Sequence, residues 1–361
     1  MTWPQWLPLR TELKPLTPYG APQVPARASL NTNENPYSPS PALQRAIADA
    51  VLRQAAQLNR YPDRDATKLR SQLSEYINGL SSTSFGAENI WAANGSNEII
   101  QSIFLAFGSG VALGFTPSYS MHPLIAKVTG TAWIDGVRNA DFSLNVNDAL
   151  AQIKQHKPVL TFITTPNNPT GGSIAISDIQ LLADATATVG GLLVVDEAYA
   201  EFSQEASAVT LIKDNPHVLV IRTMSKAFAF AGARVGYLVS DTAVKDAMLV
   251  VRLPYHLSAL TQAAASVAID FKNELLGTVT TLVAARVSLE EKLHELGLTT
   301  ISSSANFILF TGFNAPAPKL WSELLSKGVL IRDVGIPGYL RVTIGNEAEN
   351  KMFITALKEL I

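Results

Sequence analysis

The sequence contains no cysteine, which excludes disulfide bonds and thiolate metal sites. Charged residues are also scarce, at 16% of 361 residues, and they almost cancel to a formal net charge of −2. No run of basic residues is present that would attract nucleic acid or an anionic membrane surface. We therefore expect no nucleic acid or membrane partner and no metal site, and any bound anion must be held by local groups.

Long apolar runs are missing as well. No uninterrupted apolar stretch reaches the ~18 residues that a membrane-spanning helix needs. The first residues, MTWPQWLPLRTELKPL, mix prolines with charges, and so lack the basic start and apolar core of a signal peptide. We expect a cytoplasmic protein.

Apolar side chains are plentiful, at 47% of a chain long enough for two domains. Residues 1–39 are rich in proline and asparagine and show little periodicity, which predicts an extended N-terminal arm. Residues 40–257 are expected to form a large domain and residues 258–361 a smaller α+β domain. Within the arm, Tyr19 and the run NTNENPYSP, which includes Asn33, could line a cleft or form a surface loop capped by its own asparagines.

Seven short apolar runs in the large domain are candidate strands, at 90–93, 111–115, 131–137, 159–165, 192–196, 218–223 and 235–240. Three of them, starting at 159, 192 and 218, are nearly continuous Val, Ile, Leu and Phe, which is typical of strands covered on both faces. The pattern predicts an α/β fold with a mainly parallel seven-stranded sheet between helical layers. The last run follows too closely for a parallel crossover of ~12 or more residues, so it is expected to be antiparallel. In the small domain ANFILF, GVLIRDV and YLRVTIG are further candidate strands, and ENKMFITALKELI is a closing helix.

The stretch TMSKAFAFAGARVGY, residues 223–237, follows the sixth run and carries the most chemistry. Thr223, Ser225 and Arg234 could hold a phosphate, and the Lys226 amine could form a Schiff base with an aldehyde. This combination suggests pyridoxal phosphate (PLP). Taken alone, a lysine after a strand is more often a solvated side chain.

Other polar residues follow neighbouring strands, where the carboxyl ends of a parallel sheet bind ligands. Gly95, Ser96 and Asn97 start a helix and either offer N–H groups to an anion or form a simple cap. Asn168 in TTPNNPTGG could bond a ligand oxygen, and an Asn-containing prolyl turn would look the same. Asp196 ends an apolar strand, so its carboxylate needs a cation, either a protonated pyridine nitrogen or an arginine. Tyr199 could reach a ring hydroxyl or pack in the core.

Taken together, these motifs resemble the fold-type-I PLP aminotransferases, in the branch of the histidinol-phosphate aminotransferases, over nearly the whole chain. The matching segments are NENPY, NRYPD, NGSNE, PSYSMH, TTPNNPTG, VVDEAYAEF, RTMSKAFAFAGARVGY and LRVTIG. The resemblance implies transamination between L-histidinol phosphate and 2-oxoglutarate, with glutamate as product, in histidine biosynthesis. It also implies a homodimer.

The resemblance implies roles for individual residues. The catalytic residues would be Lys226, which binds the cofactor and moves a proton, together with Asp196 at the pyridine nitrogen and Tyr199 at the ring oxygen. Asn168 would share the ring oxygen, Tyr119 would stack on the ring, and the cofactor phosphate would be held by Gly95, Ser96, Asn97, Thr223, Ser225 and Arg234. The family often has an acidic or alanine residue within the stretch that reads Gly95-Ser96-Asn97 here. The expected substrate-binding residues are Tyr19, Asn33, Asn168, Arg332, Arg341 and Tyr61, the last reaching into the neighbouring subunit's site.

Several alternatives stay open at this point. An aromatic amino acid aminotransferase of the same branch would share these motifs, as would a decarboxylase acting on a phosphorylated amino acid. A non-catalytic binding protein with this fold is a third possibility. The five histidines are interpreted as non-catalytic, although His122 could line the site. Whether the Asn168–Pro169 bond is cis is not determined by the sequence.

Overall fold

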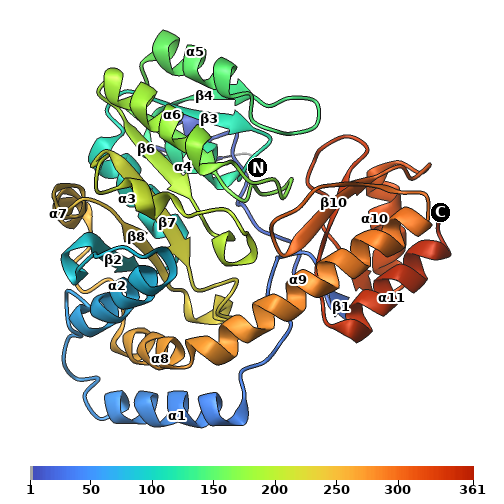
Figure 1. The fold of residues 1–361 in the computed structure, drawn as a ribbon, viewed down its shortest axis with the longest axis horizontal. Helices are drawn as coiled ribbons and strands as arrows, with labels where there is room; N and C mark the ends of the chain where they lie inside the picture. The colour runs from blue at the N-terminus through green and yellow to red at the C-terminus, as the bar shows by residue number, and fades with distance from the viewer. Residues whose placement is uncertain (1–2) are drawn as a thin grey trace.

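The computed structural model describes residues 3–361 and confirms the predicted α/β class. Figure 1 shows a large sheet-containing body and a smaller C-terminal body, with the long helix α9 (Lys272–Glu295) crossing from one to the other. Within residues 3–361, no helix combines the length and the apolar character needed to cross a bilayer.

The central sheet has seven strands, and all lie within one or two residues of the predicted runs. They are β2 (Ile90–Ala93), β3 (Val111–Thr116), β4 (Ala132–Val137), β5 (Leu160–Thr164), β6 (Leu192–Asp196), β7 (Val218–Thr223) and β8 (Gly236–Val239). Their order is β2-β8-β7-β6-β5-β3-β4. Strand β8 is antiparallel to both β7 and β2, as the short connection predicted, and the pairs from β7 to β4 are parallel.

Both faces of this sheet are covered by helices, which explains the continuous apolar runs. In β7, Leu219 and Ile221 pack into a cluster with α3 (Ser96–Phe107), α4 (Met121–Thr129) and α7 (Thr242–Val251). Val218 and Val220 point the other way, into the larger core. That face is covered by α2 (Thr67–Ser81), α5 (Val146–His156), α6 (Ile176–Thr188) and α8 (Ala259–Asp270).

Helix α1 (Pro41–Ala55) begins where the sequence predicted. The Ser40 side chain accepts a hydrogen bond from the Leu43 amide at 3.2 Å, and Pro41 occupies the first helical position. Helix α1 packs against α8. The proposed boundary at residues 257/258 thus precedes a helix that packs on α1 and α2 of the large domain.

The small domain contains an antiparallel sheet, in the order β12 (Leu340–Thr343), β10 (Phe307–Thr311), β9 (Thr299–Ile301). Helices α9, α10 (Ala317–Ser326) and α11 (Glu347–Lys358) complete it. Strand β9 was not predicted, because its Thr-Thr-Ile sequence is short and only partly buried. Five short 3-10 helices lie at Thr11–Leu13, Ala87–Asn89, Ala200–Phe202, Ala208–Leu211 and Ala231–Ala233 in the described part of the chain.

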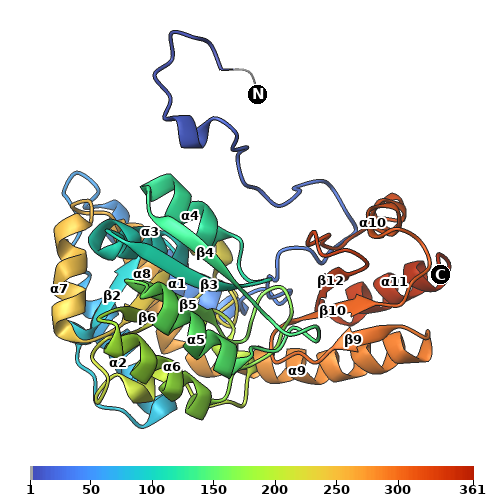
Figure 2. The same ribbon diagram turned by 90° about the horizontal axis from the view of Figure 1, so that it is seen from above.

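The N-terminal arm is extended as predicted only over its first part. Figure 2 shows this part passing α4 before it reaches the small domain, and Arg10 donates a hydrogen bond to the Lys127 carbonyl. From residue 28 onward the segment is packed: β1 (Ala28–Ser29) pairs in parallel with β11 (Val329–Leu330). Leu30 is fully buried. This pairing carries residues 31–34 back to the carboxyl ends of the central strands.

Candidate active site at the carboxyl ends of the central strands

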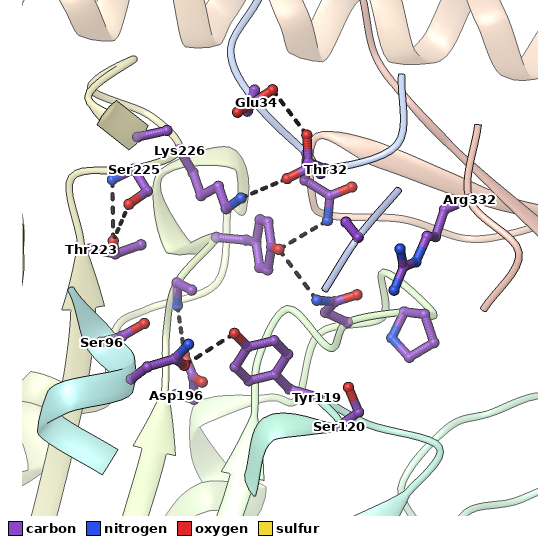
Figure 3. A pocket seen from close by; sticks show the side chains of 18 of the residues that line it. Thr32, Glu34, Ser96, Tyr119, Ser120, Asp196, Thr223, Ser225, Lys226 and Arg332 are labelled. Atoms are coloured by element: carbon purple, nitrogen blue, oxygen red, sulfur yellow. Dashed lines mark hydrogen bonds between the residues drawn. The ribbon is translucent and has the colours of Figure 1, made fainter. Parts of the chain in front are cut away.

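A cavity of about 440 Å³ lies where β5, β6 and β7 end, bounded by the small domain and by residues 31–34 (Figure 3). All predicted site residues line it except Gly95 and Tyr61. Those that do are Tyr19, Asn33, Ser96, Asn97, Tyr119, Asn168, Asp196, Tyr199, Thr223, Ser225, Lys226, Arg234, Arg332 and Arg341. The strand ends therefore bring together residues that are up to 322 positions apart, from Tyr19 to Arg341.

Lys226 extends into this cavity from the turn after β7. Its Nζ donates a hydrogen bond to the Thr32 carbonyl at 2.8 Å, a contact drawn in Figure 3, and lies 5.9 Å from the centre of the Tyr199 ring. Burial lowers the pKa of Lys226 to about 8; Arg341 and Arg234 act in the same direction and Glu34 opposes them. At pH 7 about a tenth of such amines are neutral, against less than a thousandth for an ordinary lysine. The site thus raises the share of the nucleophilic, neutral form of the amine, although the protonated form still predominates at pH 7.

Tyr199 stands beside Lys226, with its hydroxyl inside a polar cluster. The hydroxyl accepts hydrogen bonds from Asn33 Nδ2 at 2.9 Å and from Asn168 Nδ2 at 3.4 Å. Burial raises the pKa of Tyr199 to about 12. The hydroxyl therefore stays protonated near neutral pH and has its own proton left to donate to a ligand oxygen. The Asn168–Pro169 bond beside this cluster is cis, which answers the question the sequence left open.

Asp196 ends β6 and is almost fully buried. His122 Nε2 lies 3.1 Å from its Oδ2, and the Ala198 amide donates to its Oδ1 at 3.1 Å. Within residues 3–361 no lysine or arginine forms an ion pair with this carboxylate, so the arginine alternative is wrong. Asp196 faces the cavity, where a cationic ring nitrogen would complete its pairing.

His122 is the residue that the sequence interpretation undervalued. It does not line the cavity but lies behind Asp196, buried in the first turn of α4, with its ring edge-on to Tyr119 at 5.4 Å. Tyr119 lies two residues before α4 and His122 lies in its first turn, so the two rings meet although only one of them is on the helix. Thr32 was missed too, because a backbone carbonyl leaves no mark in a sequence.

Glu197 follows Asp196 and points to the other side of β6, where it fixes the end of this strand. Its carboxylate accepts hydrogen bonds from Ser207 Oγ at 2.6 Å, the Ala208 amide at 2.7 Å and Arg222 at 3.1 Å. Burial raises the pKa of Glu197, while the contact with Arg222 opposes the rise. Because Arg222 belongs to β7, this pair ties the ends of β6 and β7 together.

Hydroxyls, an arginine and a helix N-terminus converge at one end of the cavity. Thr223 and Ser225 hydrogen-bond to each other, Oγ to Oγ at 3.0 Å, and Arg234 reaches the same corner. The first amides of α3, at Ser96 and Asn97, have no intrahelical acceptor and carry the positive end of the helix dipole. These donors fit a phosphate dianion.

Gly95 does not contact the cavity, but its missing side chain makes room. Its φ is +83°, and a Cβ there would lie 2.6 Å from Arg234 Nη2. Asn97 was predicted to hold the cofactor phosphate, but its side chain has another contact. Its Oδ1 accepts a hydrogen bond from the Tyr119 hydroxyl at 3.1 Å. The side-chain oxygen therefore holds Tyr119, and an anion can use only N–H donors of Asn97, first of all its backbone N–H.

Two arginines lie at the other end of the cavity. The backbones of Arg332 and Arg341 pair directly with each other, which directs both side chains to one side. Arg341 is buried and donates to Asn168 Oδ1 and, at 2.8 Å, to the Asn31 carbonyl, while its Nε has no hydrogen-bond partner among the described residues. Burial lowers the pKa of Arg341 to about 10. Arg332 makes no side-chain hydrogen bond or ion pair with the described residues, so its guanidinium is available to an anion.

Tyr61 lies outside the cavity, and 78% of its surface is exposed. Its ring stacks on Tyr255, with the ring centres 4.3 Å apart. The structure therefore does not bring Tyr61 to the site of its own chain, and its expected role in a neighbouring subunit stays a prediction.

A comparison with known protein families identifies the family that has this arrangement. The model of the family described as "Aminotransferase class I and II" matches residues 28–357. The chain belongs to this family. Among curated relatives, the histidinol-phosphate aminotransferase of Mycolicibacterium vanbaalenii is 53% identical, over 97% of this chain and 95% of its own. That of Mycolicibacterium smegmatis is 52% identical, over 98% and 93%.

Solved structures agree with the fold of this aminotransferase. The histidinol-phosphate aminotransferase of Sinorhizobium meliloti in complex with pyridoxal-5'-phosphate matches with a TM-score of 0.85 at 22% identity, covering 98% of this chain and 97% of the other. The histidinol-phosphate aminotransferase of Clostridium acetobutylicum matches with a TM-score of 0.83 at 24% identity, covering 92% and 98%. At these identities the likeness supports the fold.

Proposed function

We propose that this aminotransferase uses PLP to transfer an amino group between L-histidinol phosphate and 2-oxoglutarate. The observation that carries the proposal is the joint placement of Lys226, Asp196 and a phosphate-sized donor cluster around one cavity, with two arginines at its far end. Relatives that are 50–53% identical over nearly their whole length carry the histidinol-phosphate aminotransferase name, which supports the choice of substrate. We also place the protein in the cytoplasm, as expected for biosynthesis of an amino acid.

When bound, PLP supplies the electron sink that makes the proton on the substrate Cα removable. Lys226 Nζ would hold the cofactor and, during the reaction, would take the Cα proton and return it. Asp196, oriented by His122, would balance the positive charge of the ring nitrogen. Tyr199 would donate a hydrogen bond to the ring oxygen, Tyr119 would cover the ring, and Thr223, Ser225 and Arg234 would hold the phosphate.

The substrate's anionic end is assigned to Arg332 and Arg341, with Tyr19 and Asn33 completing the wall. Arginine forms bidentate hydrogen bonds with phosphate and with carboxylate. One pocket can therefore serve histidinol phosphate in one half-reaction and the side-chain carboxylate of glutamate in the other.

We further propose a homodimer in which Tyr61 completes the partner's site. The support is the exposure of Tyr61 and of apolar side chains in the segment that Arg252 ties to Asp65, among them Val250 at 84% and Leu253 at 74%. A surface of this kind usually marks an interface.

The test is a comparison of kcat/KM for two amino donors, histidinol phosphate and phenylalanine, each with 2-oxoglutarate. We expect a preference of at least tenfold for histidinol phosphate. A preference for phenylalanine would favour an aromatic amino acid aminotransferase and overturn the substrate assignment. Release of carbon dioxide from a phosphorylated amino acid would indicate a decarboxylase instead.

A further inference from the structure

The stacked pair of Tyr61 and Tyr255 serves neither the core nor the cavity of its own chain. The ring centres are 4.3 Å apart and the planes differ by 15°, which is close parallel stacking. Yet 78% of Tyr61 and 40% of Tyr255 remain exposed. Two aromatic rings held against each other on a surface call for an explanation other than burial from water.

Tyr255 adopts a backbone conformation that its side chain disfavours. Its φ is +56°, in the left-handed region where a residue with a Cβ is strained. Strain of this kind persists only when the surroundings enforce it, and it gathers at functional places. The next residue provides the enforcement: His256 Nε2 bonds the Ala92 carbonyl at 2.9 Å, and its ring packs on Trp91.

The loops that carry the two tyrosines are tied into one unit. Arg252 forms an ion pair with Asp65 and donates to the Arg64 carbonyl at 3.2 Å. Gln262 Nε2 donates to the Asp63 carbonyl at 2.8 Å. Asp63 in turn accepts from the Thr67 amide at 2.7 Å, at the start of α2. Residues 63–65 are therefore tied to Arg252 and Gln262 independently of the ring stack.

We propose that Tyr255 is a positioning residue, which holds the ring of Tyr61 in the orientation that enters the neighbouring subunit's active site. The inference rests on the proposed dimer and on the role of Tyr61 in it. Without the stack, the Tyr61 ring would rotate freely about its side-chain bonds on an open surface, and the partner's site would have to restrict it during substrate binding.

The first test compares Tyr255→Phe with Tyr255→Gly. Phenylalanine keeps the ring, so kcat/KM for histidinol phosphate should stay within about twofold of the parent. Glycine removes the ring but suits the positive φ, so the melting temperature and the sedimentation coefficient should not fall. We expect kcat/KM of Tyr255→Gly to drop roughly 3- to 10-fold, mainly through a higher KM. An unchanged kcat/KM in Tyr255→Gly would overturn the inference.

A double-mutant cycle separates this inference from the function on which it rests. If Tyr255 acts through Tyr61, the variant Tyr61→Ala/Tyr255→Gly should be no slower than Tyr61→Ala alone. If the losses of kcat/KM in the two single variants multiply in the double variant, Tyr255 acts independently of Tyr61 and the positioning role is refuted. If Tyr61→Ala alone changes nothing, the fault lies with the proposed role of Tyr61, and the inference fails with it. The proposed reaction is tested separately by the substrate comparison.

Discussion

The residues of the site are polar or charged groups that are usually solvated but are buried here. Lys226 is enclosed with Arg341 and Arg234 nearby, and all three effects lower its pKa. Tyr199 is enclosed by amide donors, and burial keeps its proton on. Asp196 contacts His122 and also lines the cavity, where its negative charge can pair with a cationic ligand group. Each group is thus prepared for a ligand before the ligand arrives.

The lowered pKa of Lys226 makes a testable prediction about reactivity. In the cofactor-free protein, the rate of Lys226 acetylation by acetic anhydride should rise with a midpoint near pH 8. The same lysine in urea should react with the ordinary midpoint of about 10.4. Mass spectrometry of the peptide that contains Lys226 measures both. A folded-state midpoint above 10 would contradict the proposed environment.

The lowered pKa of Lys226 should also make the free energy of unfolding depend on pH. The folded-state pKa of Lys226 is below the unfolded value, so the unfolded chain binds more protons between pH 8 and 10.5. This single group therefore destabilises the folded cofactor-free protein most below pH 8. Its penalty fades as the pH rises through that window.

The two arginines should respond differently to substitution. Arg332→Gln removes a guanidinium that has no hydrogen-bond or ion-pair partner among residues 3–361, so KM for histidinol phosphate should rise roughly 10- to 100-fold with little change in melting temperature. Arg341→Gln should raise KM and also lower the melting temperature, because it disturbs the bonds to Asn168 and the Asn31 carbonyl. Steady-state kinetics and thermal melting separate the effects. Equal losses of stability in both variants would contradict the distinction.

Sequence reasoning found most of these residues, and its failures have physical causes. Asp196 ends an apolar strand, and Lys226 and Asn168 follow such strands within a few residues, which is a position visible in a sequence. His122 was set aside because its partner Asp196 is 74 residues away, and only the fold brings them together. The hydrogen bond of the Asn97 side chain to Tyr119 could not be predicted for the same reason.

At the scale of elements, the site is built from strand ends and one helix start. The seven central strands were predictable because both of their faces are buried, which demands continuous apolar runs. The pairing of β1 with β11 was not, since each has only two residues and depends on a partner about 300 positions away. This pairing places Thr32 and Asn33 beside Lys226 and Tyr199, so a segment predicted as arm becomes part of the site.

The start of α3 offers a matched pair of glycine substitutions. Gly95→Ala would strain a φ of +83° and put a Cβ 2.6 Å from Arg234 Nη2. We expect the dissociation constant for PLP to rise about tenfold or more. Gly277→Ala is the control, because Gly277 lies within α9 with nothing within 4 Å of an added Cβ. It should raise stability by about 0.5–1 kcal/mol and leave PLP binding unchanged. Equal PLP affinity in both variants would argue against a phosphate site formed by the start of α3 together with Arg234.

For the molecule as a whole, the proposed role of Tyr61 requires a second copy of the chain. The cavity is enclosed by the large domain, the small domain and residues 31–34, whereas Tyr61 lies on the outside. A shared site predicts that two inactive or impaired variants can complement each other.

Mixed dimers of Lys226→Ala and Tyr61→Ala test this sharing. A hybrid contains one site with Lys226 from one subunit and an intact Tyr61 from the other. Random reassembly should therefore restore about a quarter of the parent activity, since half of the dimers are hybrids with one complete site each. Activity that stays at the mean of the two parent variants would show that Tyr61 does not act across the interface.

Borohydride reduction of the PLP-loaded protein, followed by peptide mapping, tests most directly whether Lys226 binds the cofactor. We expect one pyridoxyl label per chain, on Lys226, and loss of the visible absorption that PLP shows before reduction. The parallel sample of Lys226→Ala should take up no stable label. A label on another lysine, or none in the parent protein, would contradict the assignment of this cavity as the active site.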